Sequence, residues 1–371
     1  MPNKSESAVK KRPAAFLLAV LGLAAAHGLQ AQFVFFPTTE PFNEPAGVCS
    51  GPDGNVWFTL WGNASVPSRI GRITPTGTVT TFDMPTPNGG GGDIVAGPDG
   101  NLWFLEGFAG RVGRVSPTGA MTEFPIPGSS TRPAVITVGP DGALWFSDWL
   151  RRSIWRVSLS GAFIEYPLAG SPLVSPNGLA TGSDGNLWFT ESGAYRLGRM
   201  TTSGALTLFS RPSQELSLFC ARGPDGNVWY PTFGRSFGRI TPSGAIKEFP
   251  VSGAGNVTSV AAGPDGNLWM PVNEDFICPG ICGPDTAIDG VIRVSTDGVQ
   301  TRYELPGDLI GEISKITAGP EGSMWLTARG GLIRFYPSQL SQQSSVPMIG
   351  GFGRAALLTL LALAGSAALR R

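Results

Sequence analysis

The stretch Gly-Pro-Asp-Gly-Asn-Leu-Trp-Phe at residues 97–104 carries the signal that decides the fold. Proline presets φ for a turn, aspartate tolerates the tight corner, and glycine supplies a positive φ without a Cβ clash. The Leu-Trp-Phe that follows is apolar on both alternating faces, which is typical of a short strand buried on both sides. The phrase therefore predicts a turn that leads directly into a buried strand.

Close variants of this phrase recur along the whole chain. Seven copies begin at Gly51, Gly97, Gly139, Gly182, Gly223, Gly263 and Gly319. Successive copies are 46, 42, 43, 41, 40 and 56 residues apart. A period in this range indicates a repeat architecture in which each repeat forms one supersecondary unit.

The second unit shows the plan of one repeat. We expect strands at residues 93–96, 102–105, 111–116 and 121–124, with turns at 97–101 and 117–119. Four short antiparallel strands at a period of about 40 to 45 residues describe one β-propeller blade. The sequence therefore predicts an all-β fold, a seven-bladed β-propeller built from four-stranded antiparallel blades.

The two ends of the repeat region predict how the ring closes. The seventh unit stops after its third strand, near Pro337, whereas the chain begins with an unmatched strand at residues 33–37. That strand resembles the fourth strands of other units, such as residues 122–125. We expect the N-terminal strand to complete blade 7, which leaves no free edge between the first and last blades.

The N-terminal 31 residues have the features of a secretory signal peptide. Four basic residues precede an apolar run, and Ala31 offers a small residue at the cleavage position. Removing residues 1–31 takes away four of the 27 basic residues and one of the 27 acidic residues, which leaves a net charge of −3. It also removes His27, the chain's one histidine, so the mature protein would have no imidazole for catalysis. Nothing in this charge balance indicates nucleic-acid binding.

A second apolar segment stands at the C-terminus, where residues 355–369 are followed by two arginines. Together with Val-Pro-Met-Ile at residues 346–349, it resembles the IPTL-type C-terminal sorting signals of Gram-negative bacteria, although three of the four motif residues differ. The alternative is a simple tail anchor. We therefore divide the chain into a signal peptide (1–31), a propeller (32–337), a linker (338–345) and a sorting or transmembrane tail (346–371). Both readings imply export through a Gram-negative envelope to the cell surface or the medium.

The seven phrases, with Ile-Gly-Arg-Ile-Thr-Pro-Thr-Gly and Thr-Glu-Phe-Pro between them, resemble virginiamycin B (streptogramin B) lyase and its relatives. The resemblance covers about residues 33 to 337. It implies the propeller fold and, in members with lyase activity, magnesium-assisted elimination at an ester of a cyclic depsipeptide antibiotic. The same fold also hosts lactonases and binding proteins, so the fold alone does not fix the function.

The resemblance also implies where catalytic residues would lie. A histidine stands five residues before the last turn phrase, a metal-binding glutamate two residues before that histidine, and a second glutamate at the end of the strand after the turn. A further histidine stands at the matching position of the preceding blade. In this chain these positions are Ser314, Glu312, Ala328 and Thr258, so Glu312 alone agrees. Serine is no general base in place of histidine, and alanine has no oxygen to bind magnesium.

Three carboxylates on consecutive blades are candidate ligands for Mg²⁺ or Ca²⁺. Glu106, Asp148 and Glu191 end equivalent strands, so we expect them to face one mouth of the central channel, with Asn177 beside Glu191. Hard cations take oxygen ligands of this kind. The alternative is ion pairing with a nearby arginine across each following loop, at Arg111, at Arg151 or Arg152, and at Arg196.

Features present in every unit are interpreted as structural. The turn aspartate and the arginine of the third strand recur from Asp53 with Arg72 to Glu321 with Arg334, and predict a ring of Asp–Arg ties. The seven repeated tryptophans are expected in the core between blades. Trp61 and Trp149 stand outside this set, and they are interpreted either as stacking platforms for a sugar or aromatic ligand or as buried loop packing.

The sixth unit contains an insertion, residues 271–290, with a Cys-Pro-Gly-Ile-Cys segment. In an exported protein, the close pair Cys278 and Cys282 predicts a disulfide that pins the loop. Asp275, Asp285 and Asp289 are further Ca²⁺ candidates, and the loop is a candidate recognition element. Cys49 and Cys220 fall in non-adjacent blades, and we expect them to be buried free thiols.

Two functional hypotheses follow. The first is a surface-anchored or secreted propeller that binds an extracellular ligand as a monomer, without catalysis and without nucleic acid, and that contacts the membrane through its C-terminal tail before sorting. The second is an enzyme, either a metal-dependent carbon–oxygen lyase that opens streptogramin B-type depsipeptides or a lactonase-like hydrolase. Metal content on purification would discriminate between them.

Overall fold

The computed structural model describes residues 33–38, 44–62, 66–168, 175–233, 235–253, 255–273, 290–306 and 313–340. The chain divides into two compact units, residues 1–337 and 338–371. The predicted signal peptide, residues 341–345 of the linker and the predicted tail all lie outside the described residues. Within the described ranges, no helix has the length and apolar character needed to cross a bilayer.

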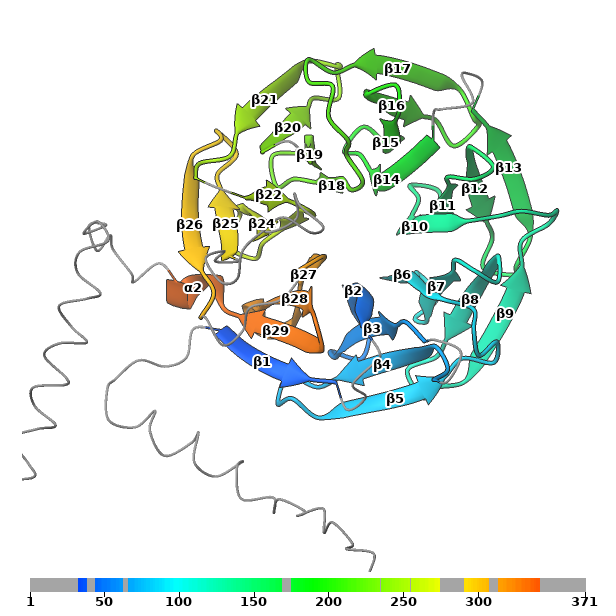
Figure 1. The fold of residues 1–371 in the computed structure, drawn as a ribbon. Coiled ribbons are helices and arrows are strands. Elements are labelled where there is room, and N and C mark those ends of the chain that lie inside the picture. The colour runs from blue at the N-terminus through cyan, green and yellow to red at the C-terminus, as the bar shows by residue number, and fades with distance from the viewer. Residues whose placement is uncertain are drawn as a thin grey trace, which may run out of the picture. The chain divides into compact units, whose positions relative to one another are not determined.

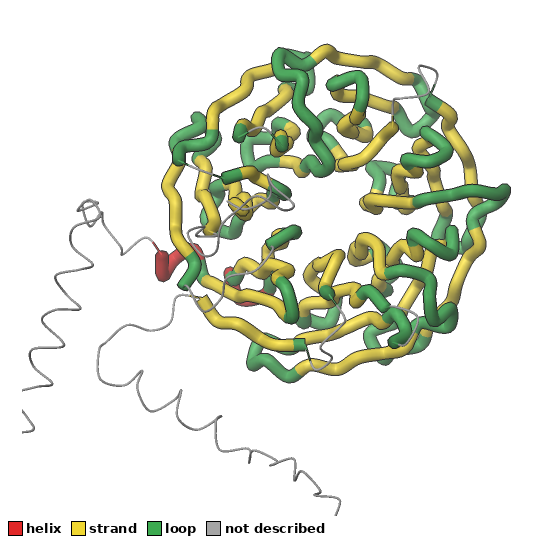
Figure 2. The backbone as a smooth tube through the Cα atoms, in the orientation of Figure 1, coloured by secondary structure: helices red, strands yellow, loops and turns green. Residues whose placement is uncertain are grey.

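The described part of the first unit is a seven-bladed β-propeller, as predicted (Figure 1). Seven antiparallel sheets stand around a central axis, six with four strands each and one with five. Among the described residues, almost all regular structure is strand (Figure 2), apart from the 3-10 turn η3 (Pro320–Gly322) and the short helix α2 (Pro337–Leu340). Antiparallel neighbours joined by short turns explain why each repeat forms its own sheet.

Each blade runs from an innermost strand beside the channel to an outermost strand at the circumference. The innermost strands are β2 (Pro45–Ser50), β6 (Gly91–Ala96), β10 (Pro133–Val138), β14 (Ser175–Thr181), β18 (Ala221–Arg222), β22 (Asn256–Val257) with β23 (Ala261–Ala262), and β27 (Ile316–Ala318). The second strands are β3 (Val56–Leu60), β7 (Leu102–Glu106), β11 (Leu144–Asp148), β15 (Leu187–Ser192), β19 (Val228–Thr232), β24 (Leu268–Asn273) and β28 (Met324–Ala328). The third strands are β4 (Arg69–Ile73), β8 (Arg111–Val115), β12 (Ser153–Val157), β16 (Arg196–Met200), β20 (Ser236–Ile240), β25 (Gly290–Val294) and β29 (Gly331–Phe335). The outermost strands are β5 (Val79–Asp83), β9 (Met121–Pro125), β13 (Phe163–Pro167), β17 (Leu206–Ser210), β21 (Ile246–Pro250), β26 (Gln300–Glu304) and β1 (Phe33–Pro37).

The ring closes through its N-terminal strand, as the sequence predicts. Strand β1 pairs antiparallel with β29, with Phe33 opposite Phe335 and Pro37 opposite Gly331. Phe36 of β1 stacks on Trp325 with ring centroids 5.3 Å apart. In blade 2 the same place is taken by Phe124, which stacks on Trp103 at 5.5 Å. The first strand therefore serves as the outer strand of the last blade in its side chains as well as its backbone.

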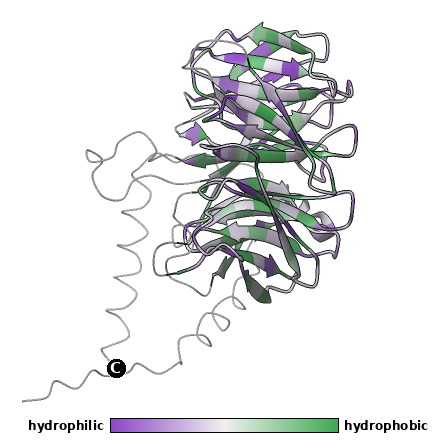
Figure 3. Ribbon diagram, turned by 90° about the vertical axis from the view of Figure 1, so that its right-hand side faces the viewer, coloured by the Kyte–Doolittle hydropathy of each residue, from purple (hydrophilic) through white to green (hydrophobic). Residues whose placement is uncertain are grey.

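The seven repeated tryptophans form the core between blades. All seven are fully buried. Trp57 of blade 1, for example, belongs to one cluster with Ile94, Leu102 and Phe104 of blade 2. In Figure 3 many strands carry green, hydrophobic stretches. Burial of aromatic area between sheets is the main favourable contribution to such packing.

The propeller has two rims, which differ in what connects the strands. We call the edge that holds the Gly-Pro-Asp-Gly turns and the turns between third and fourth strands the turn rim. We call the opposite edge, which holds the loops between second and third strands and those between blades, the loop rim. Antiparallel order places all connections of each kind at the same edge.

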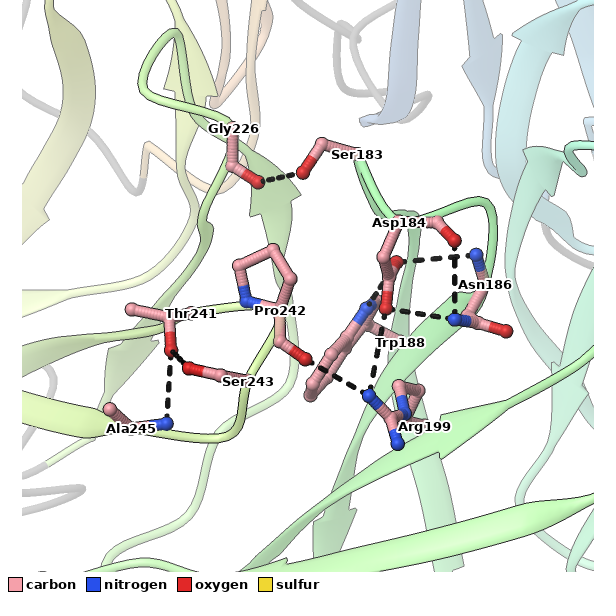
Figure 4. Close-up of polar contacts among 10 residues, drawn as sticks. All are labelled: Ser183, Asp184, Asn186, Trp188, Arg199, Gly226, Thr241, Pro242, Ser243 and Ala245. Atoms are coloured by element: carbon pink, nitrogen blue, oxygen red, sulfur yellow. Dashed lines mark hydrogen bonds and ion pairs between the residues drawn. The ribbon is translucent and has the colours of Figure 1, made fainter.

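On the turn rim, the repeated aspartate is an acceptor for tryptophan. Asp184 Oδ1 accepts the indole N–H of Trp188 at 3.1 Å, and its other oxygen accepts the amide of Asn186 (Figure 4). Six blades have this aspartate–tryptophan bond, at 2.9 to 3.1 Å. Burial raises the pKa of Asp184, but these hydrogen bonds bring it below its usual value.

The repeated arginine ties neighbouring blades together. Arg199 of blade 4 donates to the carbonyl oxygen of Pro242 in the turn of blade 5 at 2.9 Å, and its guanidinium lies 5.6 Å from the Trp188 ring centroid (Figure 4). Its distance to Asp184 is 3.9 Å. Among the described residues, ion pairs of this kind are found in four blades. The predicted Asp–Arg tie is thus only part of a larger contact that links one blade to the next.

Candidate functional site

The seven blades differ from one another at the loop rim. The last residue of the common second-strand pattern differs from blade to blade, while the tryptophan three residues earlier is constant. In blade order these residues are Leu60, Glu106, Asp148, Glu191, Thr232, Val272 and Ala328. A position that the fold does not fix is free to serve function, so the loop rim is the candidate functional surface.

The positions that the family resemblance matches to lyase histidines are Thr258, in blade 6, and Ser314, in blade 7. Ser314 Oγ lies 2.8 Å from Thr327 Oγ1, and its backbone N–H donates to the carbonyl oxygen of Thr327 at 3.2 Å. Thr258 donates its hydroxyl to the carbonyl oxygen of Ile313 at 3.2 Å. Both hydroxyls therefore have partners in the scaffold. Glu312 lies outside the described residues.

A cavity of about 390 Å³ opens beside Ser314, without Thr258 in its lining. Its lining includes Ser314 and Ala328 together with Trp61 and Phe219. It also includes Glu44 and Arg329, two exposed side chains that lie 3.8 Å apart. The serine hydroxyl is already in contact with Thr327, and the alanine brings only a methyl group. The cavity can hold a ligand, but its lining includes no general base other than the exposed Glu44.

A family model described as the virginiamycin B lyase family matches residues 170–278. The solved streptogramin B lyase superposes with a TM-score of 0.70 at 27% identity, covering 81% of this chain and 96% of that one. The chain is a virginiamycin B lyase-like β-propeller. A catalytically inactive histidine-to-alanine variant of virginiamycin B lyase from Staphylococcus aureus, solved with quinupristin, gives a TM-score of 0.72 at 25% identity, covering 81% of this chain and 98% of that one.

Curated relatives support the same resemblance over a short stretch. The virginiamycin B lyases of Bordetella parapertussis and Bordetella bronchiseptica are each 43% identical over 61 residues. That match covers 16% of this chain and spans only 19% of the length of those relatives. The full-length likeness of this lyase-like propeller therefore rests on the structural comparison.

The three carboxylates expected at one channel mouth have different partners in this lyase-like propeller. Glu191 pairs with Arg196 at 2.8 Å, as the ion-pair alternative expects. Asp148 Oδ1 accepts three backbone N–H bonds, from Arg132, Leu150 and Arg151, at 3.0 to 3.1 Å. The described residues contain no group of three His, Cys, Asp or Glu side chains placed to hold a metal.

Glu106, the third of these carboxylates, is fully buried, and neither of its oxygens has a hydrogen-bond partner in the described part of the chain. Burial, followed by the neighbouring Glu123 carboxylate, raises the pKa of Glu106 to about 8, and Arg111 lowers it only in part. Arg111 itself bonds Glu123 at 3.4 Å. Each carboxyl therefore has its own contacts, and the shared cation site of Glu106, Asp148 and Glu191 stays a prediction.

Arg151 and Asn177, which the sequence places beside two of these carboxylates, have other side-chain partners in the structure. Arg151 forms a two-bond pair with Glu165 at 2.8 and 2.9 Å, so its guanidinium is engaged away from Asp148. The Asn177 amide donates to Ser192 Oγ at 3.0 Å, because a bulge between Pro176 and Leu179 shifts the register. The structure thus places Asn177 one residue away from its expected partner.

The channel contains a charged pair that the sequence patterns did not indicate. Lys315 of blade 7 donates to Asp93 of blade 2, and its ammonium lies 5.4 Å from the Phe219 ring centroid. Gly47 of blade 1, the intervening blade, packs closely against Asp93, since an added Cβ there would lie 2.9 Å from Asp93 Cα. The sequence does contain a signal for this pair. Asp93 and Lys315 occupy equivalent positions in their innermost strands, directly before Ile94 and Ile316. The residues at this position in most other blades are small or apolar.

The cysteine predictions have separate outcomes. Cys49 and Cys220 are free, with Cys49 buried and Cys220 partly so, and both line the channel. Burial raises the pKa of both thiols, so neither is a reactive thiolate at neutral pH. Cys278 and Cys282 lie outside the described residues, as do the three insertion aspartates.

Trp61 and Trp149 have exposed side chains, 43% and 46% accessible, which favours the platform interpretation over buried packing. Phe108, 54% exposed, joins them on the loop rim and was not singled out from the sequence. Its place in the sequence could have indicated this, because Phe108 follows strand β7 as the two tryptophans follow β3 and β11.

Proposed function

We propose that this protein is an exported binding propeller that retains the lyase-like scaffold and cavity but not the lyase chemistry. The observation that carries the proposal is the pair Ser314 and Ala328, which replace a histidine base and a glutamate ligand. A serine hydroxyl bonded to Thr327 does not take up a proton at neutral pH. An alanine supplies no oxygen to a hard cation.

One structural neighbour indicates that binding can persist without catalysis. The Staphylococcus aureus variant that lacks one histidine is named catalytically inactive, yet its structure contains quinupristin. In that protein, loss of a histidine thus leaves ligand binding possible. The one histidine of the present chain is His27, in the predicted signal peptide.

The decisive experiment is incubation of the purified protein with quinupristin, with magnesium and separately with EDTA, followed by mass spectrometry for linear product. We expect no opening in either condition. Magnesium-dependent product that EDTA abolishes would contradict the proposal and support the lyase alternative. A triple variant, Thr258→His with Ser314→His and Ala328→Glu, is the matched control, because it restores the family residue types beside Glu312.

Export and surface display are part of the proposal and rest on the sequence of the two ends. The test is intact-mass measurement of the protein recovered from the producing cell's envelope or medium. We expect a mass that lacks residues 1–31. Recovery of the uncut chain in the cytoplasm would contradict export.

A further inference from the structure

Three exposed aromatic side chains gather on the loop rim of blades 1, 2 and 3. Trp61, Phe108 and Trp149 each follow the second strand of their blade. They line a cavity of about 280 Å³ together with Arg132 and with Gly90, Gly92, Gly107, Pro133 and Ala134. Large aromatic side chains that stay exposed together, beside a concave surface, mark a binding site more often than a packing defect.

Backbone hydrogen bonds fix the main chain from which these three rings extend. The N–H of Trp61 donates to the carbonyl oxygen of Glu44 at 3.0 Å, that of Phe108 to Gly89 at 2.8 Å, and that of Trp149 to Arg132 at 3.3 Å. The Trp61 and Phe108 rings meet edge to face with centroids 5.1 Å apart. A pocket whose walls are fixed in advance loses less entropy on binding.

Glycine is required at the floor of the pocket. Gly90 has φ of 76°, and a Cβ added there would lie 2.5 Å from the Phe108 ring. Gly90, Gly92 and Gly107 contribute only backbone to the lining. Such a floor admits a planar group at close range.

Arg132 supplies the one charged side chain of the lining. Its guanidinium carbon lies 4.6 Å from the Phe108 ring centroid. It has no acidic partner among the residues that the structure describes, unlike Arg151 and Arg196 on the neighbouring blades. A cation stacked on a ring, with its hydrogen-bonding edge unused, is suited to a carboxylate.

We propose that this pocket binds a small planar aromatic carboxylate, with its ring between the aromatic walls and its carboxylate on Arg132. The lining is almost wholly apolar, which disfavours a sugar, because buried hydroxyls without partners are costly. The inference rests on the proposed function only in that a binding protein needs a ligand. Trp61 borders both cavities, but no other lining residue is shared.

The test is isothermal titration calorimetry of the full protein with 2-naphthoate, compared with uncharged 2-naphthylmethanol, non-aromatic cyclohexanecarboxylate and methyl glucoside. We expect naphthoate to bind tightest. Arg132→Met should weaken naphthoate roughly tenfold and leave naphthylmethanol unchanged, since a hydrogen bond to a charged group contributes that much. Phe108→Ala should weaken both aryl probes about three- to tenfold.

Two control variants separate the role of the Arg132 side chain from a general effect of removing an arginine. Arg132→Lys keeps the charge but loses the planar guanidinium, so it should retain only part of the naphthoate affinity. Arg222→Met removes an exposed arginine elsewhere and should change nothing. Failure of the wild-type protein to bind naphthoate, equal binding of naphthylmethanol, or preference for the glucoside would overturn the proposal. Quinupristin opening by the same sample would contradict the proposed function and leave this pocket untouched, so the two failures are distinguishable.

Discussion

The turn rim and the loop rim are made by the same repeats, yet only one of them is repetitive. On the turn rim, the aspartate–tryptophan bond recurs in six blades, and arginines bond the carbonyl of the next blade's turn in five. On the loop rim, every blade ends its second strand differently from its neighbours. Where the fold requires a contact the residue repeats, and where it does not the residue is available for function.

Blade 7 shows which role the turn aspartate has in the other six blades. Its turn contains Glu321 at φ 56° in place of aspartate, and Trp325 donates its indole N–H to Ser323 Oγ at 2.9 Å instead. The acceptor changes while the bond to tryptophan remains. The requirement is therefore an oxygen that satisfies a buried indole N–H, because an unpaired buried donor is costly.

The largest effect should come from removing one of the repeated tryptophans. Trp103→Ala empties a fully buried site between blades 2 and 3 and leaves Asp99 without its indole donor. We expect a loss of about 3 to 5 kcal/mol in the free energy of unfolding, measured by urea denaturation. A loss below about 1 kcal/mol, the size of a surface change, would break the distinction between the two rims.

The loop rim should carry a pH dependence of its own through Glu106. Its folded pKa of about 8 exceeds the usual value of 4.5, so the folded state binds more protons than the unfolded state between these values. Stability from this group is therefore full below pH 4.5 and is lost as the pH rises through 8. We expect the Tm of the wild-type protein to fall by several degrees between pH 5 and pH 8.5.

Glu106→Gln is the matched variant, because it keeps the shape and cannot ionise. The variant should lose most of that fall in Tm while keeping the wild-type response to urea at pH 5. The chain has a single histidine, so few other groups titrate in this interval. Parallel pH profiles for both proteins would show that burial of Glu106 does not set the alkaline limit.

A smaller effect is expected from the arginine that joins two blades. Arg199→Met removes the hydrogen bond to Pro242 of the next blade but keeps an apolar side chain over Trp188. We expect about 1 to 2 kcal/mol of destabilisation, read from thermal or urea unfolding. Arg222→Met, at an exposed arginine of β18, should change stability by less than about 0.5 kcal/mol. Equal losses in both variants would remove the inter-blade role.

The sequence predicts this fold closely because its signals are local and repeated. Residues 102–105 were expected as a strand and form β7, one residue longer, and the closure by β1 follows from counting strands. The site was less predictable, because it depends on partners from other strands. Arg111 bonds Glu123 of the outer strand and not Glu106 across the loop. The Lys315–Asp93 pair joins residues of blades 7 and 2, which no local pattern brings together.

The smallest stability effect should come from the loop rim, and it sharpens the comparison most. Trp149→Ala removes a tryptophan as large as Trp103, but its side chain is 46% exposed and its backbone bond to Arg132 survives the substitution. We expect less than about 0.5 kcal/mol of change in unfolding free energy, with weaker binding of 2-naphthoate by calorimetry. Two tryptophans of one chain would then differ about sixfold or more in their contribution to stability, because one lies between blades and the other faces solvent. If Trp149→Ala instead destabilised the protein as much as Trp103→Ala, the aromatic residues of the loop rim would be structural, and the pocket that they line would lose its claim to be a binding site.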